Sequence, residues 1–528
     1  MHTDTKAQLP LFTQLPAIGQ LAGWRRNLTA FVCGVLAMLA LPPFFIVPFM
    51  VPACCGLLWL INGAASRRRL FWDGWFWGWG YYMSGLYWFC IALMTDAEKF
   101  AWLLPFALFG LTGVIAIYQG LICWLMGFFR VSGFTRIFVF SVVWLLVEFA
   151  RGHLFTGFPW NLAGYTLAVS DVSIQLASLV GIYGLTWLVI FLALLPSSLG
   201  DADIGRRRAL RVTGAAYLLF AIALAWGGWR LHAAGHTQYV DGVMLRLVQA
   251  NIAQHHKWDP ALQVQGLQKH IELSRAEGIE NITHVIWPET AAPYIIDERS
   301  KLLQILSAML PADTKLITGG LRAEGESSDW RIYNSIVMVD SAGAIVGTYD
   351  KNRLVPFGEF LPFRSLIPEK WATPVGNKDF SRGPGAVTLD WPGLPGVTPL
   401  ICYEAIFPEF AAGAHPRPKL FLNLTNDAWF GTSTAPYQHL HMSRMRAVEQ
   451  GIPLIRVANT GMSLVVDAMG RVLKRSSLNQ IAVIDTRLPQ PENSKTLYGF
   501  IGDRPIILLL MLAVLLFLGM KKKNIYLK

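Results

Sequence analysis

Long apolar runs alternate with short basic clusters along the first 230 residues of this 528-residue chain. The longest run, Leu28 to Ile61, would form a helix about 50 Å long, whereas a bilayer core is about 30 Å thick. Pro42-Pro43 near its middle therefore predicts two spans. In all, the pattern predicts eight membrane-spanning helices: two in Leu28–Ile61, then Leu70–Met94, Ala101–Phe129, Ile137–Phe149, Ile174–Leu199, Ala209–Trp229 and Pro505–Met520.

Basic clusters in alternate loops orient this predicted bundle, because Lys and Arg accumulate on the cytoplasmic side of a membrane. With eight spans, all the clusters fall on one side, and both termini are cytoplasmic. The clusters are Arg25–Arg26, Arg67–Arg69, Arg130 with Arg136, Arg206–Arg211, and Lys521–Lys523. The segment between the seventh and eighth spans is then on the outer side.

That segment alternates short apolar runs with polar helical stretches, a pattern typical of a layered α/β domain. Strands are predicted at Met244–Ala250, His284–Trp287, Leu316–Gly319, Tyr333–Val339, Ile345–Tyr349, Val397–Ile401, Leu420–Leu424, Leu454–Val457, Ser463–Val466 and Ile481–Ile484. Helices are predicted at Asp259–Gly278, Ser300–Leu310 and Pro436–Gly451. We therefore expect a seven-helix bundle at 1–230, an α/β domain at 231–503, and a last membrane helix with a basic tail at 504–528.

Two loops, Asn352–Pro362 and Phe363–Gly396, are long for a compact domain, and their apolar residues follow neither a helical nor a strand periodicity. The first carries Phe357 and Phe360 in a segment expected outside the membrane. It could cover a lipid substrate as a lid, or pack into the domain. The sequence leaves both interpretations open.

Composition supports an integral membrane protein, with 53% hydrophobic residues, 15% charged residues and a mean hydropathy of +0.41. The net charge of +11 does not indicate nucleic-acid binding, because the basic residues cluster beside apolar segments. No CxxC pair or HExxH motif occurs, so we expect no metal site and no cofactor.

Two ionisable residues, Glu148 and Arg151, lie three positions apart near the end of the fifth predicted span. Their spacing favours an ordinary i,i+3 ion pair. Contact with phospholipid head groups is the alternative, since ionisable residues near a membrane are often functional.

One cysteine stands apart from the others. Five lie inside apolar runs, where a free cysteine behaves as a small hydrophobe; they are Cys33, Cys54, Cys55, Cys90 and Cys123. Cys402 instead directly follows the predicted strand Val397–Ile401, and the ends of strands commonly carry catalytic groups. Cys402 is therefore the candidate nucleophile.

A thiol nucleophile needs a base and a positive neighbour, and two other predicted strands end in such residues. Glu289 follows Ile286-Trp287-Pro288, and Lys351 follows Tyr349-Asp350. Glu289 could act as the base only if burial raised its pKa above about 4.3, whereas Lys351 would lower the pKa of a nearby thiol from about 8.5. Periodicity does not tell whether the three residues meet.

Four segments, in order, resemble the motifs of the nitrilase superfamily. They are Trp287–Thr290 (WPET), Tyr349–Glu359 (YDKNRLVPFGE), Ile401–Glu404 (ICYE) and Asn423–Gly431 (NLTNDAWFG). With membrane spans on either side, the whole chain is similar to the bacterial apolipoprotein N-acyltransferase family. The resemblance implies an α-β-β-α sandwich.

The resemblance also implies roles for individual residues. Glu289 is expected to be the general base, Lys351 the oxyanion stabiliser and Cys402 the nucleophile. The supporting residues implied by the family are Glu359 behind the triad, Tyr403 and Glu404 lining the site, and Trp258 as a further functional tryptophan. We expect Asn426, Asp427 and Trp429 to form the wall of the site without reacting.

The implied reaction has two half-steps. The cysteine takes an acyl chain from a phospholipid as a thioester, and the α-amino group of a diacylglyceryl-modified N-terminal cysteine on an apolipoprotein then accepts it. The implied location is the bacterial inner membrane, with the catalytic domain on the periplasmic side.

Two alternatives to this function stay open. A membrane-bound nitrilase-type amidase or hydrolase would use the same triad with water as the second nucleophile. A non-enzymatic scaffold or transporter would keep Cys402 as a structural residue, but the complete motifs and the lack of mid-membrane charges argue against it.

Overall fold

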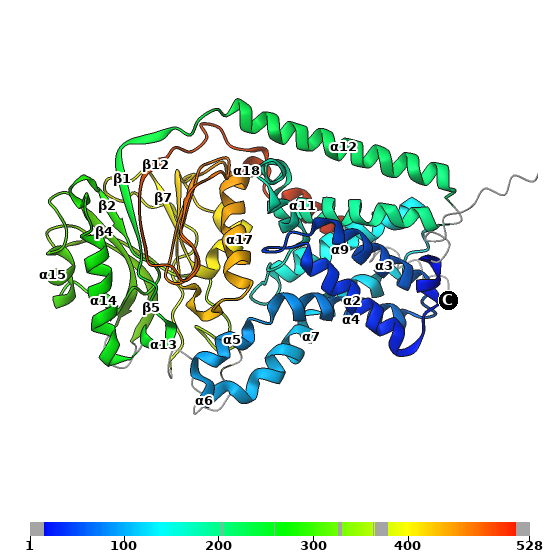
Figure 1. The fold of residues 1–528 in the computed structure, drawn as a ribbon, viewed down its shortest axis with the longest axis horizontal. Helices are drawn as coiled ribbons and strands as arrows, with labels where there is room; N and C mark the ends of the chain where they lie inside the picture. Colours follow the sequence, from blue (N-terminus) through cyan, green and yellow to red (C-terminus); the bar gives the residue numbers. More distant parts are fainter. Residues whose placement is uncertain are drawn as a thin grey trace, which may run out of the picture. The chain divides into compact units, whose positions relative to one another are not determined.

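The computed structural model describes residues 15–201, 204–257, 259–325, 330–362, 364 and 378–513. The chain forms two compact units (Figure 1). The first comprises Met1–Cys90, Phe100–Trp229 and Ile501–Lys528, and the second comprises Ile91–Lys99 and Arg230–Phe500.

The first unit is helical, as its apolar runs predict, because a backbone that leaves water must satisfy its polar groups within the segment. The longer helices are α2 (Gly23–Leu39), α3 (Met50–Asn62), α4 (Arg67–Leu86), α8 (Ile117–Met126), α9 (Gly133–His153), α11 (Ala177–Leu194) and α12 (Arg206–Ala233). Short helical segments are α7 (Thr112–Ile115) and α10 (Asp171–Ile174), whereas most of α5 (Phe89–Leu93) and α6 (Ala97–Phe100) falls in the stretch Ile91–Lys99 of the second unit. The break predicted at Pro42-Pro43 is present, because the chain leaves the α-helical form between α2 and α3.

Four stretches within the described part of the chain are long and apolar enough to cross a membrane: Phe106–Met126, Gly133–His153, Ala177–Gly200 and Arg206–Ala233. Two shorter apolar helices cover Val47–Asn62 and Arg504–Ala513. The remaining predicted spans fall on α2, which has 17 residues, and on α4, which carries Arg67–Arg69 and Asp73. Residues 514–520 of the last predicted span lie outside the described residues. The eight-span arrangement and its orientation therefore stay predictions.

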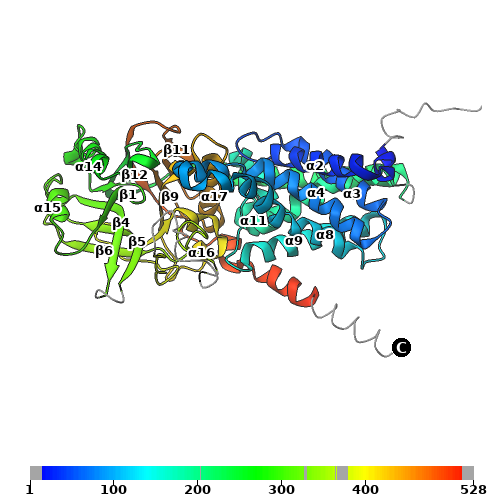
Figure 2. The same cartoon turned by 90° about the horizontal axis from the view of Figure 1, so that it is seen from below.

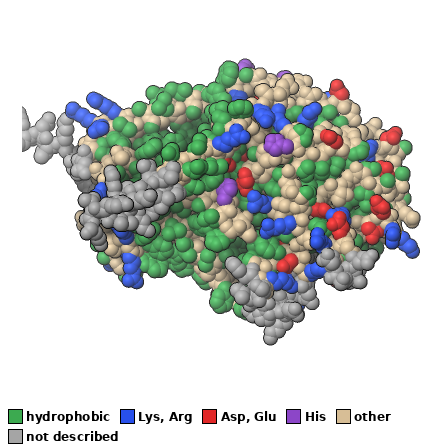
Figure 3. All heavy atoms as spheres, turned by 180° about the vertical axis from the view of Figure 1, so that it is seen from behind, with side chains coloured by type: hydrophobic (Ala, Val, Ile, Leu, Met, Phe, Trp, Pro, Cys, Tyr) green, Lys and Arg blue, Asp and Glu red, His purple; other side chains and the backbone are tan. Residues whose placement is uncertain are grey.

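Apolar side chains cover much of the visible face of the helical unit (Figure 3). On α12, only 11% of the most apolar window is buried within the protein. Leu218, Leu219 and Ile222 on this helix are each more than half exposed. So large an apolar surface suits contact with lipid.

The second unit contains two β-sheets. The strands are β1 (Tyr239–Gln249), β2 (His284–Ile286), β3 (Ala292–Ile295), β4 (Lys315–Glu324), β5 (Arg331–Val339), β6 (Ile345–Asp350), β7 (Val397–Ile401), β8 (Leu420–Thr425), β9 (Leu454–Ala458), β10 (Leu464–Val466), β11 (Val472–Arg475) and β12 (Ala482–Pro489). The larger sheet has the order β12-β1-β2-β4-β5-β6 with β3 paired to β4, and the smaller has the order β11-β10-β9-β8-β7. β1 and β12 run antiparallel, and Tyr239 pairs with Pro489.

The two sheets pack face to face around the main core, to which Leu247 and Ile317 contribute from the larger sheet and Leu422 and Ile455 from the smaller. The helices of this unit are α13 (Gln254–Lys257), α14 (Pro260–Ser274), α15 (Lys301–Ser307), α16 (Pro408–Ala412), α17 (Ala435–Gln450) and α18 (Leu497–Ile501). α14 and α15 cover the outer face of the larger sheet, and α17 packs on the smaller sheet (Figure 2). The layers are those of the expected α-β-β-α sandwich.

All ten predicted strands and all three predicted helices are present in this unit; the ends of most are shifted, whereas Val397–Ile401 matches β7 at both ends. The sequence pattern does not predict β3 or β11. β3 contains a proline, and β11 is a charged edge strand in which three of four residues are exposed, so neither shows the apolar signature of a strand.

Candidate active site

Cys402 is the first residue after β7. β7 is buried along its whole length and leads into a short 3₁₀ helix, η10 (Cys402–Ile406). Cys402 has a φ of +48°, in the left-handed region, which costs a residue with a Cβ roughly 1–3 kcal/mol. Cys402 is 8% exposed to solvent. The surrounding structure therefore holds this cysteine in a conformation that it would not adopt alone.

Glu404 fixes the turn that carries Cys402. Its carboxylate accepts hydrogen bonds from the backbone N–H groups of Ile401 and Asn352, both at 2.7 Å, and from the hydroxyl of Tyr349 at 3.0 Å. Burial raises the pKa of Glu404 to about 7, although the two N–H donors act in the opposite direction. Glu404 is fully buried, so its carboxylate joins the Cys402 turn to the segment after β6.

Lys351, the first residue after β6, lies between two carboxylates. Its Nζ donates to Glu359 Oε1 at 2.8 Å and to Glu289 Oε1 at 3.4 Å. All three side chains are buried. Burial alone would lower the pKa of Lys351, but Glu359 and Glu289 outweigh it and raise the pKa, so the ammonium stays charged. Three of the predicted residues thus meet in one cluster.

Asn334 of β5 completes this cluster, and sequence reasoning missed it. Its Nδ2 donates to Glu289 Oε1 at 2.8 Å and to Glu359 Oε1 at 2.9 Å, so one amide bridges both carboxylates. The sequence does carry a signal, because asparagine is depleted in strands and here stands within an apolar β-strand.

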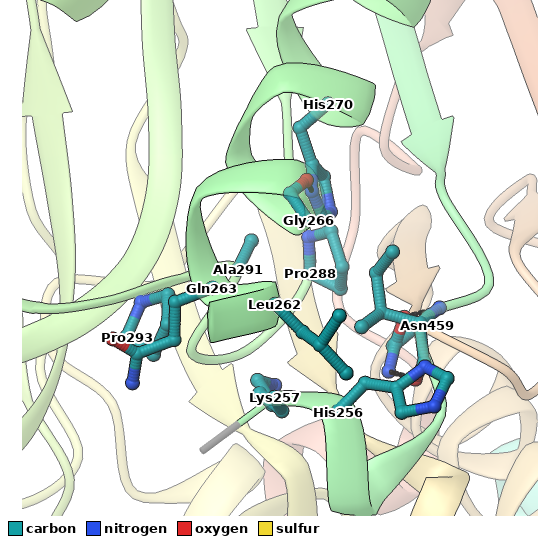
Figure 4. Close-up of a pocket in the computed structure, with 11 residues that line it drawn as sticks. His256, Lys257, Leu262, Gln263, Gly266, His270, Pro288, Ala291, Pro293 and Asn459 are labelled. Carbon is teal, nitrogen blue, oxygen red and sulfur yellow. Dashed lines mark hydrogen bonds between the residues drawn. The ribbon is translucent and has the colours of Figure 1, made fainter. Parts of the chain in front are cut away.

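Lys257 of α13 is a second cation that sequence reasoning missed. Its Nζ donates to the backbone carbonyl of Glu289 at 2.8 Å. Burial lowers the pKa of Lys257 to about 8, against the opposing effect of Glu289 and Cys402. Lys257 also lines a small cavity with His256 and Pro288 (Figure 4). The cavity therefore borders the cluster beside Glu289.

The thiol of Cys402 lies in the electrostatic field of this cluster. Burial, followed by Glu289, raises the pKa of the thiol to about 12, while Lys351 acts to lower it. Lys351 therefore lowers the pKa of the thiol, as predicted, but burial raises that pKa by more. The thiol is neutral near pH 7 and needs a base when it attacks, which is the chemistry that Glu289 can supply. The Lys351 ammonium can stabilise an oxyanion.

Two sequence profiles match the chain. The Apolipoprotein N-acyltransferase N-terminal domain matches residues 33–195, and Carbon-nitrogen hydrolase matches residues 244–494. The Apolipoprotein N-acyltransferase of Rhodopseudomonas palustris is 38% identical over 516 residues, which cover 95% of this chain and 96% of that protein. That of Bradyrhizobium diazoefficiens is 38% identical over 515 residues, covering 94% and 95%. The chain belongs to the apolipoprotein N-acyltransferase family.

The nitrilase domain expected of the family is the α/β unit, because the carbon-nitrogen hydrolase profile runs from within β1 to beyond β12. Among solved structures, an amidase from Nesterenkonia sp. is similar to 48% of this chain and to 94% of its own chain, with 20% sequence identity and a TM-score of 0.35. In the described part of the chain, no group of three or more His, Cys, Asp or Glu residues could hold a metal ion.

Asn426 and Asp427, which we expected to form the wall of the site, both follow β8 and are buried. The backbone N–H of Asn426 donates to Glu289 Oε2 at 2.9 Å, so Asn426 contacts the cluster directly. Asp427 contacts the buried pair His439 and Arg456 instead, at 3.0 and 2.7 Å. Burial acts to raise the pKa of Asp427, but these two neighbours lower it to about 2.

The other predicted residues lie around the Cys402 turn, in the turn after β8 and in the predicted lid. Tyr403 is buried, and its ring lies edge-on to Phe407 with centroids 5.0 Å apart. Trp429 is half-buried in the turn after β8. Phe357 is 58% exposed, whereas Phe360 is half-buried. Residues 352–362 form no helix or strand, and one aromatic ring of this loop faces outward.

Trp258, the further tryptophan implied by the family, lies outside the described residues. Residues 363 and 365–377 of the second predicted loop also lie outside them.

Proposed function

We propose that this member of the apolipoprotein N-acyltransferase family transfers an acyl chain from a phospholipid, through a thioester on Cys402, to the α-amino group of an N-terminal diacylglyceryl-cysteine. The observation that carries the proposal is the buried Lys351 ammonium between Glu289 and Glu359, in the electrostatic field of a strained cysteine. The names of the two relatives support an apolipoprotein as the acceptor.

In the first half-reaction, Glu289 takes the proton from the thiol while the Cys402 sulfur attacks the ester carbonyl carbon. The π electrons move onto the carbonyl oxygen, and the Lys351 ammonium stabilises the resulting oxyanion. When the oxyanion collapses, the ester C–O bond breaks. The lysophospholipid oxygen then takes the proton from Glu289, and the acyl group stays on sulfur as a thioester.

In the second half-reaction, the free α-amino group attacks the thioester carbonyl and gives a proton to Glu289. The C–S bond breaks, an amide forms, and the proton returns to the Cys402 sulfur. Water must be kept away from the thioester for the amine to be the acceptor. The near-complete burial of Cys402 suits that requirement.

The proposal includes a membrane arrangement, since both substrates are anchored in lipid. We place the α/β domain, 231–503, on the periplasmic side of the bacterial inner membrane, between a seven-helix bundle at 1–230 and a last span with a basic cytoplasmic tail at 504–528. The alternation of basic clusters supports eight spans with both termini in the cytoplasm. The exposed Phe357 supports a loop that meets lipid.

The test uses purified full-length protein and a phospholipid with a labelled acyl chain. Wild type should acquire a hydroxylamine-sensitive label that Cys402→Ala loses completely. Cys90→Ala is the matched control, because Cys90 is also a free cysteine but is half-buried in the helical unit, and this variant should keep the label.

Adding a diacylated lipopeptide should move the label from the protein to the peptide amine. Absence of any adduct on folded wild-type protein would rule out the thioester. If the label appeared only as free fatty acid with the lipopeptide present, the protein would be a hydrolase using the same triad.

A further inference from the structure

A chain of buried hydrogen bonds ends on the backbone of Cys402. His439 of α17 has its Nε2 3.1 Å from the Cys402 carbonyl oxygen and its Nδ1 3.0 Å from Asp427 Oδ1. Arg456 of β9 donates from Nη2 to Asp427 Oδ2 at 2.7 Å. His439 is 1% exposed, and Asp427 and Arg456 are fully buried.

The far end of this chain is anchored in the smaller sheet. Arg456 also donates from Nη1 to Asn423 Oδ1 at 2.5 Å, and Asn423 Nδ2 donates to the carbonyl of Leu400 at 2.8 Å. These residues lie on the adjacent strands β9, β8 and β7. The position of His439 is therefore set by three strands, of which the last leads directly into Cys402.

The surroundings of the imidazole decide which ring nitrogen carries hydrogen. If the ring is charged, both nitrogens donate, one to Asp427 and one to the Cys402 carbonyl. If the ring is neutral with hydrogen on Nε2, Nδ1 can accept from Arg456 Nη2, which lies 3.3 Å away, although its lone pair then also faces the Asp427 carboxylate at 3.0 Å. The other neutral form would face a lone pair on Nε2 toward the carbonyl lone pairs and leave that buried oxygen without this donor.

We propose that His439 is a positioning residue that holds Cys402 in its left-handed conformation by donating from Nε2 to the Cys402 carbonyl. The bond fixes the peptide plane that follows the cysteine, and so opposes relaxation of its φ of +48°. The thiol is thereby kept in the orientation in which Glu289 and Lys351 act on it. This inference rests on the proposed nucleophilic role of Cys402.

Two nearly isosteric variants distinguish a hydrogen bond to the Cys402 carbonyl from a general contribution of His439 to protein stability. The amide nitrogen of His439→Gln can occupy the position of Nε2 and keep the donor to Cys402, whereas the shorter His439→Asn can reproduce only the Nδ1 position beside Asp427. His441→Gln makes the same change elsewhere on α17 and controls for the loss of an imidazole from this helix.

The measurements are the rate of thioester formation with labelled phospholipid, its dependence on phospholipid concentration, and thermal unfolding. His439→Asn should lower the rate at saturating phospholipid by about tenfold to a hundredfold, with KM little changed. His439→Gln should restore most of that loss, although both variants unfold at similar temperatures. His441→Gln should react like wild type.

A parallel measurement follows alkylation of Cys402 by iodoacetamide, with mass spectrometry separating this peptide from the other cysteines. It should rank the variants in the same order, and it does not depend on acyl transfer. Equal thioester and alkylation rates in His439→Asn and His439→Gln would overturn the positioning role. If wild type formed no thioester, the proposed function would fail, while the alkylation rates would still decide the role of His439.

Discussion

Each unit contains a buried charge cluster whose contrast is informative, because only one of the two lies beside a thiol. In the helical unit, Arg151 donates from Nε to Glu148 Oε2 at 3.1 Å. Gln119 donates to the other oxygen of Glu148 at 2.6 Å, and Arg151 also bonds the carbonyl of Phe158. In the α/β unit, a single ammonium, that of Lys351, faces two carboxylates.

The difference separates a structural pair from a reactive cluster. Glu148 and Arg151 cancel each other's charge and are both buried, so the i,i+3 ion pair predicted from their spacing is confirmed. In the cluster around Lys351, one ammonium faces two carboxylates, and Lys257 adds a second cation beside Glu289. The cluster lies close enough to Cys402 to affect the pKa of its thiol. Buried charge alone therefore does not mark a site, whereas buried charge beside a nucleophile does.

The sharpest way to break this comparison is to neutralise the proposed base. Glu289→Gln should slow thioester formation by about a hundredfold to ten thousandfold, because general-base catalysis is lost. Single-turnover labelling of Cys402 measures the rate, and thermal unfolding checks the fold.

Glu359→Gln is the matched control for Glu289→Gln. It removes the carboxylate on the other side of Lys351. We expect the rate of thioester formation to fall only about tenfold, because Glu359 would act through Lys351 rather than on the thiol. A larger loss in Glu359→Gln than in Glu289→Gln would reverse the assignment of the base.

The second prediction concerns the helical pair. Arg151→Met should destabilise the protein by about 3–5 kcal/mol, because it leaves the Glu148 carboxylate buried and unpaired. Thermal unfolding in detergent measures the loss, and the folded fraction should still form the thioester at a rate close to that of wild type.

The double variant Glu148→Leu with Arg151→Met removes both charges and should recover most of the stability lost in Arg151→Met. If Arg151→Met folded normally but formed no thioester, the helical pair would belong to the catalytic machinery and the comparison would fail.

The smallest effect is expected on the titration of the thiol. Lys351 lowers the pKa of Cys402, so Lys351→Met should raise it further and slow alkylation of Cys402 between about pH 8 and pH 10 by about tenfold. Glu289 raises the pKa of Cys402, so Glu289→Gln should lower that pKa and speed alkylation. Alkylation of the buried Cys123 serves as the internal control, and equal pH profiles in the two variants would contradict this account.

Much of the α/β fold could be predicted because apolar runs of strand length carry its core. Val397–Ile401 and Leu420–Leu424 are buried at every position, and short continuous runs of this length, bounded by Gly or Pro, favour buried strands. β11 could not be predicted, since Lys474 and Arg475 on an exposed edge strand give no apolar signal.

The candidate site could be predicted only in part. Glu289, Lys351 and Cys402 were found because each follows a strand within a motif. Asn334 and His439 were missed, since one lies within a strand and the other within a helix far along the sequence. Only the pairing of the strands and the packing of α17 bring these two residues to the site, and neither is determined by local patterns.

The pairing of β1 with β12 has a consequence for how the protein is made. β1 is the first strand of its unit to be synthesised, yet the neighbour on its outer edge is the last. Until Ala482–Pro489 has emerged, that edge stays open to any other strand it meets, which is a hazard for aggregation. A chain that stops before Ala482 keeps this open edge, so we expect truncated products to aggregate or be degraded instead of persisting as shortened enzymes.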